Sequence, residues 1–303
     1  MTLRTAIIGS GNIGCDVLCK VQRSALLDCT LFAGRNASSP GLALARARGV
    51  PVTDRGAEGL FAALDSFDLV FDATSSAAHQ AHAPALEAAG KVVVNLTPAP
   101  NGALCVPSLN GNALLKAGNI NMITCGGQAS IPIAQAMTRA NPDINYLEVV
   151  SSISAESAGP ATRLNLNHYI ETTESALRQF TGCSNVKAIL NINPAKPNVY
   201  MQTAISALAA HHDLAAAKAA IAKAVARLRA AVPGYDVIVE PHVTGDRLFT
   251  MVRVTGAGDY LDPSAGNLDI ITAAATKMAE AIARAGGRRG AAPAVPQPME
   301  SVA

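Results

Sequence analysis

The chain has 303 residues, a formal net charge of +2 and an isoelectric point near 8.2. Half of the residues are hydrophobic and 15% are charged, a balance that excludes a disordered chain. The small net charge, the absence of tryptophan and the 4% of aromatic residues disfavour a nucleic-acid-binding protein, which needs basic patches and aromatic stacking platforms.

The six cysteines are scattered along the chain, without the paired spacing that structural zinc sites require. We therefore predict no metal site, and free thiols in a reducing cytoplasm. The first residues lack the apolar core and the cleavage site of a signal peptide. Because no apolar run is long enough to span a bilayer, we also expect no membrane partner.

A glycine-rich turn follows the first apolar run. Residues 5–8 predict a short buried strand and residues 15–21 predict a helix. The turn between them is typical of a dinucleotide-binding βαβ unit, in which Gly9 makes the turn, Gly11 admits the pyrophosphate and Gly14 lets the helix pack on the strand. An ordinary strand-turn-helix is the alternative. The cofactor contacts predicted here are Gly9, Ser10, Gly11, Asn12, Ile13 and Gly14.

The loop after the second predicted strand, residues 29–34, bears on the choice of cofactor. NAD-selective folds usually place an acidic residue near this point to bind the ribose 2′-OH. Here the next residue is Arg35, which can pair with a 2′-phosphate or stack on adenine. A solvated loop arginine is an equally good interpretation, so the preference between NAD and NADP stays open.

The alternation of strands and helices continues through the first third of the chain. Residues 42–47 are helical in pattern, and residues 50–52, 67–75 and 91–96 are strand-like. This order predicts a Rossmann-type, doubly wound parallel sheet. The strand at 67–75 ends in a polar loop, where open α/β sheets bind ligands.

Two histidines, His79 and His82, begin the helix that follows this strand. Their spacing of three residues is also found in metal-binding pairs. No carboxylate or cysteine nearby completes a site, so we interpret both as exposed helix histidines.

Cys125 lies where an apolar run ends and a second helical pattern begins. The positive end of a helix dipole lowers a thiol pKa and favours the nucleophilic thiolate. Gly126 and Gly127 would leave bare backbone N–H groups for a substrate carbonyl. Cysteines are more often small buried hydrophobes, but the two glycines and the polar residues after them lead us to predict that Cys125 is a nucleophile.

The second half of the chain has a different pattern. Residues 146–155, 187–192 and 247–254 predict strands, and an amphipathic helix between 214 and 232 follows a potential cap at Asp213. This favours an α+β domain with a mostly antiparallel sheet. We predict a dinucleotide-binding domain at 1–124, completed by a C-terminal helix at 267–285, a catalytic and oligomerisation domain at 125–266, and a disordered tail at 286–303.

Several stretches together resemble the acylating acetaldehyde dehydrogenases of bacterial aromatic and sterol degradation, over residues 5–283. They are Gly-Ser-Gly-Asn-Ile-Gly (9–14), Asp-Leu-Val-Phe-Asp-Ala-Thr-Ser (68–75), Asn-Leu-Thr-Pro (95–98), Asn-Met-Ile-Thr-Cys-Gly-Gly-Gln-Ala (121–129), Ser-Ala-Gly-Pro-Ala-Thr-Arg (157–163), Val-Pro-Gly-Tyr (232–235) and a segment with Ala-Gly-Asn-Leu-Asp (265–269).

The resemblance implies oxidation of acetaldehyde to acetyl-coenzyme A with NAD, and Cys125 as the nucleophile that forms a thiohemiacetal and then a thioacyl enzyme. It also implies a 4-hydroxy-2-oxovalerate aldolase as partner, in a homo-oligomer or hetero-oligomer. Further cofactor contacts are implied at Ser157, Ala158, Gly159, Pro160, Ala161, Thr162, Arg163, Leu164, Asn165 and Asn267. Asn267 and backbone N–H groups near Cys125 are candidates to hold the oxyanion.

The chain departs from this family at three places: Ala161 replaces a glycine, Asn167-His168 replaces an acidic pair, and Thr203 replaces an aspartate proposed as a base. Threonine accepts no proton at neutral pH, so either no base is needed or another group serves. His168 is a candidate, and a surface loop histidine is the alternative.

Two other functions remain open from the sequence. A semialdehyde dehydrogenase with another acyl acceptor would need an anion pocket of arginines, for which Arg163 is the main candidate. A dinucleotide-binding partner subunit could have lost its activity together with the aspartate at position 203.

Overall fold

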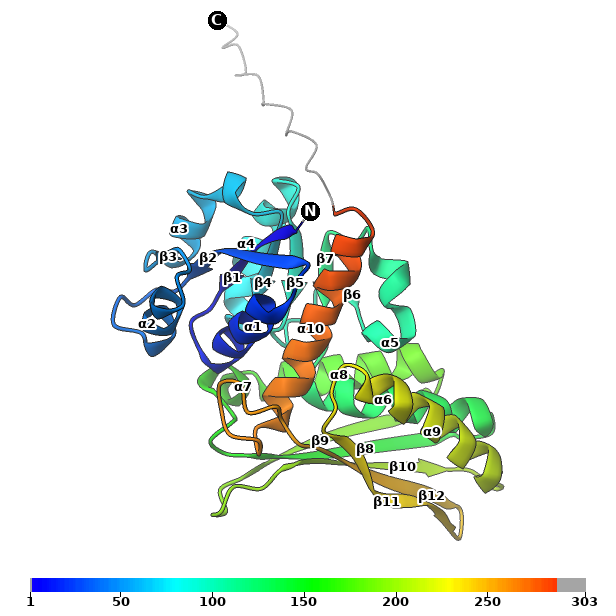
Figure 1. The fold of residues 1–303 in the computed structure, drawn as a ribbon. Coiled ribbons are helices and arrows are strands. Elements are labelled where there is room, and N and C mark those ends of the chain that lie inside the picture. Colours follow the sequence, from blue (N-terminus) through cyan, green and yellow to red (C-terminus); the bar gives the residue numbers. More distant parts are fainter. Residues whose placement is uncertain (1, 288–303) are drawn as a thin grey trace, which may run out of the picture.

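The computed structural model describes residues 2–287, without the side chains of Pro160 and Ala161. The structure contains two β-sheets, each with its own helices. The first sheet lies above the second in Figure 1, and the helix α10 (Gly266–Arg284) runs from one to the other. Of the predicted disordered tail, residues 288–303 lie outside the described residues. Within the described part, no helix has the length and apolarity needed to cross a membrane.

The first sheet has seven strands in the order β3-β2-β1-β4-β5-β7-β6, and all of its neighbouring strands are parallel. The predicted doubly wound parallel sheet is therefore confirmed. Its strands are β1 (Leu3–Ile8), β2 (Leu27–Ala33), β3 (Val52–Thr53), β4 (Leu69–Asp72), β5 (Val92–Asn95), β6 (Ala103–Leu104) and β7 (Asn119–Asn121).

Helices cover both faces of this sheet, which explains why its central strands are apolar throughout. Successive residues of a strand point to opposite faces. Ile7 thus packs in one cluster with Val17, while Ile8 packs in another with Leu86. The helices are α1 (Asn12–Arg23), α2 (Pro40–Ala47), α3 (Gly56–Phe61), α4 (Ser76–Ala88) and α5 (Pro107–Asn110), with short 3₁₀ turns η1 (Leu64–Ser66) and η2 (Gly111–Leu114).

The second sheet has five strands in the order β11-β12-β10-β8-β9. Only the β8–β9 pair is parallel, so the predicted mostly antiparallel sheet is also confirmed. The strands are β8 (Tyr146–Ser154), β9 (Val186–Asn193), β10 (Met201–Leu208), β11 (Tyr235–Thr244) and β12 (Arg247–Val254). Strands β8, β9 and β12 were predicted from the sequence, whereas β10 and β11 were not.

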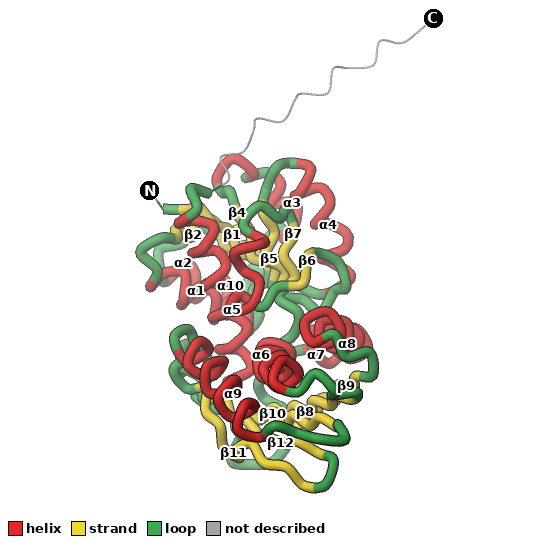
Figure 2. Tube along the Cα trace, turned by 90° about the vertical axis from the view of Figure 1, so that its right-hand side faces the viewer, coloured by secondary structure: helices red, strands yellow, loops and turns green. Residues whose placement is uncertain are grey.

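Helices lie on one side of the second sheet and leave its other side uncovered within the described chain (Figure 2). They are α6 (Cys125–Ala140), α7 (Pro160–Leu164), α8 (Leu166–Thr181) and α9 (Leu214–Arg229). The Asp213 side chain caps α9 as expected, because it accepts a hydrogen bond from the Ala216 N–H at 2.9 Å. Helix α6 packs against α8 and α9.

The last helix, α10 (Gly266–Arg284), lies against α1 and also contacts α6 (Figure 1). A buried ion cluster ties it to α1. The Lys20 ammonium lies 2.7 Å from Asp16, 3.0 Å from Asp259 and 2.8 Å from Asp269. Burial would lower the pKa of Lys20, but Asp16 and Asp269 raise it overall, so the lysine stays charged. The cluster therefore fixes the start of α10 relative to the glycine-rich turn.

Candidate active site

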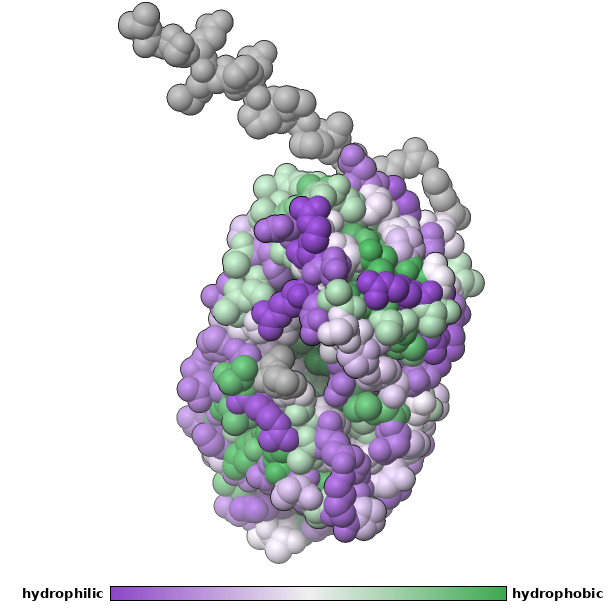
Figure 3. Space-filling view, turned by 90° about the vertical axis from the view of Figure 1, so that its left-hand side faces the viewer, coloured by the Kyte–Doolittle hydropathy of each residue, from purple (hydrophilic) through white to green (hydrophobic). Residues whose placement is uncertain are grey.

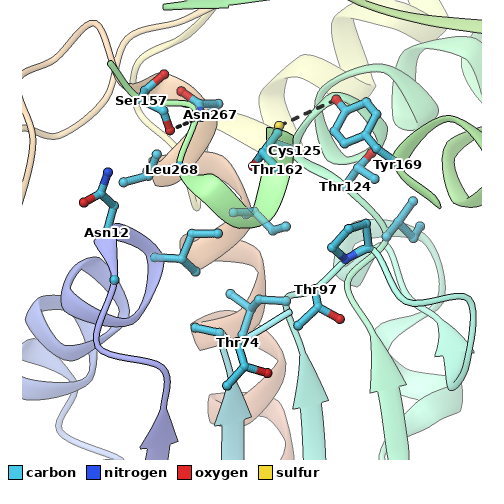
Figure 4. A pocket seen from close by; sticks show the side chains of 18 residues that line it. Asn12, Thr74, Thr97, Thr124, Cys125, Ser157, Thr162, Tyr169, Asn267 and Leu268 are labelled. Atoms are coloured by element: carbon cyan, nitrogen blue, oxygen red, sulfur yellow. Dashed lines mark hydrogen bonds between the residues drawn. The ribbon is translucent and has the colours of Figure 1, made fainter. Parts of the chain in front are cut away.

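A pocket lies where the carboxyl ends of β1, β4, β5 and β7 meet the N-termini of α6 and α10. This is the edge at which open α/β sheets bind ligands. On the face shown in Figure 3 the surface is hollowed between the upper and lower halves of the molecule. The predicted site residues that line the pocket are Gly11, Asn12, Ile13, Cys125, Ser157, Gly159, Thr162 and Asn267 (Figure 4).

The three glycines of the N-terminal turn differ in their surroundings. Gly9 has φ +111°, and a Cβ built on it would lie 2.4 Å from the Ala73 carbonyl oxygen. A Cβ on Gly14 would lie 1.9 Å from the Gly9 carbonyl oxygen. Both positions therefore exclude any side chain. A Cβ on Gly11 would meet nothing within 4 Å, so the backbone at the start of α1 is open to the pocket, as a phosphate cradle requires.

Asn267 presents an unsatisfied polar atom at the other end of the pocket. Its Nδ2 donates to the Ser157 carbonyl oxygen at 3.4 Å, whereas its Oδ1 is buried without a hydrogen-bond partner. A buried acceptor without a donor is uncommon in folded proteins and is readily satisfied by a ligand N–H group. Together with the open backbone at Gly11, this fits a bound dinucleotide.

Other predicted cofactor residues lie outside the pocket lining. Arg163 donates from Nε to the Ala158 carbonyl at 3.0 Å and from Nη2 to the Ala155 carbonyl at 2.8 Å, so it holds its own loop together. Leu164 is 83% exposed, and Arg35 is exposed in the loop after β2. Gly9, Gly14, Ser10, Ala158 and Asn165 also do not line it.

Cys125 is the first residue of α6, as the sequence predicts. The side chain of Thr124 caps the helix, since its Oγ1 accepts from the Gly127 N–H at 2.9 Å. The preceding residue, Ile123, has φ +63°, a left-handed conformation that is rare for a β-branched residue. This turn brings the Cys125 side chain to the pocket, where it is 9% exposed.

The N–H groups beside Cys125 are already bonded, so the expectation of bare backbone donors is wrong. The Gly126 N–H donates to the Tyr169 hydroxyl at 3.0 Å, and the Gly127 N–H donates to Thr124. A Cβ on Gly126 would lie 2.3 Å from the Tyr169 Oη. Glycine is thus needed at position 126 so that Tyr169 can approach the helix.

The pKa of the Cys125 thiol is raised, contrary to the lowering expected from the helix dipole. Burial is the largest influence and disfavours the thiolate. Hydrogen bonds from the Tyr169 hydroxyl and the Gly126 N–H oppose it in part. The helix terminus does not lower this pKa overall, because the Cys125 side chain is nearly enclosed and its desolvation has the larger effect.

His79 and His82 are buried, and the expectation that they are exposed is wrong. The missing carboxylate is Asp72 at the end of β4. Its Oδ2 lies 2.7 Å from His79 Nδ1 and 2.6 Å from His82 Nε2, and its Oδ1 accepts from both the N–H and the hydroxyl of Thr74. Burial alone would raise the pKa of Asp72, but the two histidines hold it well below its usual range.

The three groups could together offer ligand atoms to a metal ion, yet each hydrogen bond is of ordinary length and satisfies the carboxylate fully. Thr74 lines the pocket. The network therefore fixes the loop after β4 against the site. This network was not predicted from the sequence, because Asp72 meets His79 and His82 only when helix α4 folds back over the end of strand β4.

Comparisons with known proteins place this architecture in a family. A sequence profile described as "Prokaryotic acetaldehyde dehydrogenase, dimerisation" matches residues 125–262. The acetaldehyde dehydrogenase of Pectobacterium atrosepticum is 50% identical over 282 residues, which cover 92% of this chain and 95% of that protein. That of Spirochaeta aurantia is 50% identical over 283 residues, covering 93% and 95%.

The chain belongs to the acetaldehyde dehydrogenase family. Among solved structures, the aspartate semialdehyde dehydrogenase II of Vibrio cholerae has a TM-score of 0.61 and covers 94% of this chain and 98% of its own. The aspartate semialdehyde dehydrogenase of Candida albicans, solved with NADP, has a TM-score of 0.65 with 93% and 100% coverage. Both are 14% identical to this chain, so they support the fold alone.

Of the residues that depart from the acetaldehyde dehydrogenase pattern, Asn167, His168 and Thr203 lie outside the pocket lining. Thr203 is buried on β10, and its Oγ1 lies 2.9 Å from the Ser151 Oγ. His168 is half-buried, and its Nδ1 is enclosed without a hydrogen-bond partner. The residue that does reach Cys125 is Tyr169, which the sequence analysis missed because only tertiary packing brings α8 to the start of α6.

Proposed function

We propose that this protein oxidises acetaldehyde, or another short aldehyde, to the acyl-coenzyme A thioester with NAD. The observation that carries the proposal is one shared pocket, lined by Cys125, by the open backbone of Gly11 and by the unsatisfied amide of Asn267. The choice of acetaldehyde as substrate rests on the relatives, which are named acetaldehyde dehydrogenases.

Gly11, Asn12 and Ile13 would hold the pyrophosphate of the dinucleotide, and Asn267 with Ser157 would hold its nicotinamide end. NAD supplies the acceptor for the hydride that the aldehyde carbon loses. No acidic residue follows β2 to select NAD over NADP, because Arg35 stands there. We therefore expect NAD to be used with weaker discrimination against NADP than an acidic residue would give. Comparing kcat/KM for the two cofactors tests this expectation, and an NAD preference of many thousandfold would contradict it.

Cys125 does the covalent chemistry in this proposal. Its thiol first loses a proton to solvent, and the sulfur then bonds to the aldehyde carbon to give a thiohemiacetal. Oxidation of that carbon leaves an acyl group on the sulfur as a thioester. The thiol of coenzyme A then loses its proton to solvent, its sulfur attacks the acyl carbon, and the bond to Cys125 breaks to return the thiolate. Because the acyl enzyme and the product are both thioesters, this transfer is nearly isoenergetic. A serine would form an oxygen ester and lose that advantage.

An oxyanion forms on the aldehyde oxygen during each attack. Because the Gly126 and Gly127 N–H groups are bonded elsewhere, the Asn267 amide and the N–H of Cys125 itself are the predicted donors that remain in the pocket lining. The bond from Asn267 Nδ2 to Ser157 is long, at 3.4 Å, and therefore easily exchanged.

The acyl acceptor distinguishes this activity from that of a semialdehyde dehydrogenase that uses another acceptor. An acceptor such as phosphate would need a cationic pocket, but Arg163 is engaged by backbone carbonyls. We expect cofactor reduction with acetaldehyde and coenzyme A, and little with inorganic phosphate in its place. A protein that reduces no cofactor with any aldehyde would instead be a non-catalytic subunit.

We further propose that two copies pair through the uncovered side of the second sheet. Ala204 lies opposite Val150 on one side and Met251 on the other, and all three are half-buried. Their neighbours Val149, Ile205 and Thr250 point to the helices instead and are buried. The profile that covers this sheet is described as a dimerisation region.

An aldolase partner is proposed from the family resemblance alone.

A further inference from the structure

The side chain of Tyr169, on helix α8, forms a hydrogen bond with the Cys125 sulfur. Its hydroxyl lies 3.6 Å from the Cys125 Sγ (Figure 4). The same oxygen accepts the Gly126 N–H at 3.0 Å. Tyr169 is 5% exposed, so the contact is shielded from water.

While Cys125 is a thiol, either it or the Tyr169 hydroxyl can donate in this hydrogen bond. Burial, and the neighbouring Cys125, raise the pKa of Tyr169 well above its usual value, so the phenol keeps its proton at working pH. Its oxygen already accepts a bond from Gly126. A thiolate carries no hydrogen, so once Cys125 is ionised the phenol is the donor, and a hydrogen bond to a charged acceptor is stronger than one to a neutral acceptor.

No charged side chain takes this position in the described part of the chain. The family resemblance implies an aspartate at position 203, but Thr203 is paired with Ser151 beneath the helix. His168, the other candidate, does not line the pocket. The influences on the pKa of Cys125 are burial, the Tyr169 hydroxyl and backbone N–H groups.

We propose that Tyr169 is a catalytic residue that donates its phenolic hydrogen to the Cys125 sulfur and stabilises the thiolate. It would act twice: before the sulfur attacks the aldehyde, and when coenzyme A displaces the sulfur as a leaving group. The phenol keeps its proton throughout, and the proton of the thiol goes to solvent. This inference rests on the proposed role of Cys125 as nucleophile.

The test measures the thiol itself, independently of aldehyde oxidation. The rate at which iodoacetamide alkylates Cys125 is followed against pH by mass spectrometry of the Cys125 peptide, in the wild type and in Tyr169→Phe. Loss of the donor raises the thiol pKa, so less thiolate is present at neutral pH. We expect alkylation at neutral pH to fall about tenfold and the two profiles to converge at high pH.

Tyr235→Phe is the matched control. Tyr235 is also buried, and its hydroxyl donates to the Ala129 carbonyl of the same helix at 2.6 Å, away from the sulfur. Both substitutions remove one buried hydroxyl that bonds α6. We expect Tyr235→Phe to cost stability but to leave the alkylation profile of Cys125 unchanged. Equal shifts in the two variants would overturn the proposal, because a general loosening of α6 would then explain both.

A second variant covers the case in which Tyr169→Phe does not fold. Replacing Tyr169 with 3-fluorotyrosine keeps the shape and makes the hydroxyl a stronger donor, so alkylation at neutral pH should become faster. An unchanged profile in the folded variants would overturn the role of Tyr169. A shifted profile in a protein that oxidises no aldehyde would support the Tyr169 contact and refute the proposed function instead.

Discussion

At the scale of single residues, the site is built around a thiol that is kept from ionising easily. Cys125 is nearly enclosed, and burial outweighs the neutral donors that surround it. Free thiols with raised pKa values are weak nucleophiles at neutral pH. The structure therefore predicts a protein whose reactivity depends strongly on pH.

The first prediction concerns that dependence. The thiolate is the reactive form, and the pKa of Cys125 lies above its ordinary value of 9.0. The thiolate fraction thus increases as pH rises through this region. Pre-steady-state reduction of cofactor by acetaldehyde should accelerate about tenfold per pH unit between neutral pH and pH 8, because the raised pKa of Cys125 keeps the thiolate a minor species there. A rate that is flat across this range would show that the bound cofactor or substrate has already ionised the thiol.

At the scale of elements, the sequence reveals what depends on local pattern. The glycine-rich turn, strands β1 to β5 and the start of α6 were predicted, because apolar runs and glycines are close together in the chain. Strands β6 and β7 were not predicted, because they have only two and three residues. Strand β10 was missed because small residues such as Ala204 and Ser206 blur its alternation. Strand β11 was missed because Pro241 and two register shifts interrupt it.

The contacts that shape the site were harder to foresee. Tyr169 reaches Cys125, and Asp72 binds His79 and His82, only after helices pack on one another or fold back on a strand. Residue type alone gave no signal for either contact. In contrast, Gly11 was predicted from its contiguous glycine-rich motif and Asn267 from the family resemblance, and both line the pocket.

The ion cluster between α1 and the entry to α10 supports a prediction about stability. Hydrogen bonds from Arg23, together with Lys20, lower the pKa of Asp259 to about 2, against an ordinary value of 3.8. A depressed carboxyl pKa stabilises the fold above the ordinary value, and this stabilisation is lost as pH falls through the depressed one. Asp259→Asn should therefore lower the free energy of unfolding by about 2 kcal/mol at neutral pH.

Urea unfolding at several pH values checks this expectation. The difference between the wild type and Asp259→Asn should shrink below pH 3.8 and nearly vanish at about 2. Asp143→Asn, at an exposed carboxylate, is the control and should change stability little at any pH. A pH-independent difference would mean that Asp259 acts through packing instead of charge.

At the scale of the whole molecule, the pocket lies between the two sheets and takes residues from both halves. We infer that residues 1–124 with 267–285 form the dinucleotide-binding domain, and that residues 125–266 form the catalytic and oligomerisation domain. Cys125 begins the second domain, and Asn267 begins the return to the first. The chemistry therefore depends on how the ion cluster and α6 hold the halves together.

Pairing through the second sheet gives a prediction at this scale. Met251→Glu places a charge in the half-buried apolar row with Val150 and Ala204, and burying an unpaired charge is unfavourable. Sedimentation velocity should show a dimer for the wild type and monomers for Met251→Glu at micromolar concentrations. Lys218→Glu, exposed on α9, should stay dimeric. A dimer that survives Met251→Glu would place the interface elsewhere.

The central claim is that Cys125 carries the acyl group, and intact-protein mass spectrometry tests it most directly. The wild type is mixed with acetaldehyde and NAD, without coenzyme A, so that the thioester has no acceptor except water. We predict a mass increase of one acetyl group, located on the Cys125 peptide and removed when coenzyme A is added. Cys125→Ala should bind NAD normally but show no adduct, with turnover reduced at least about a thousandfold. An acetyl group on another residue, or a Cys125→Ala protein with near-normal turnover, would contradict the account.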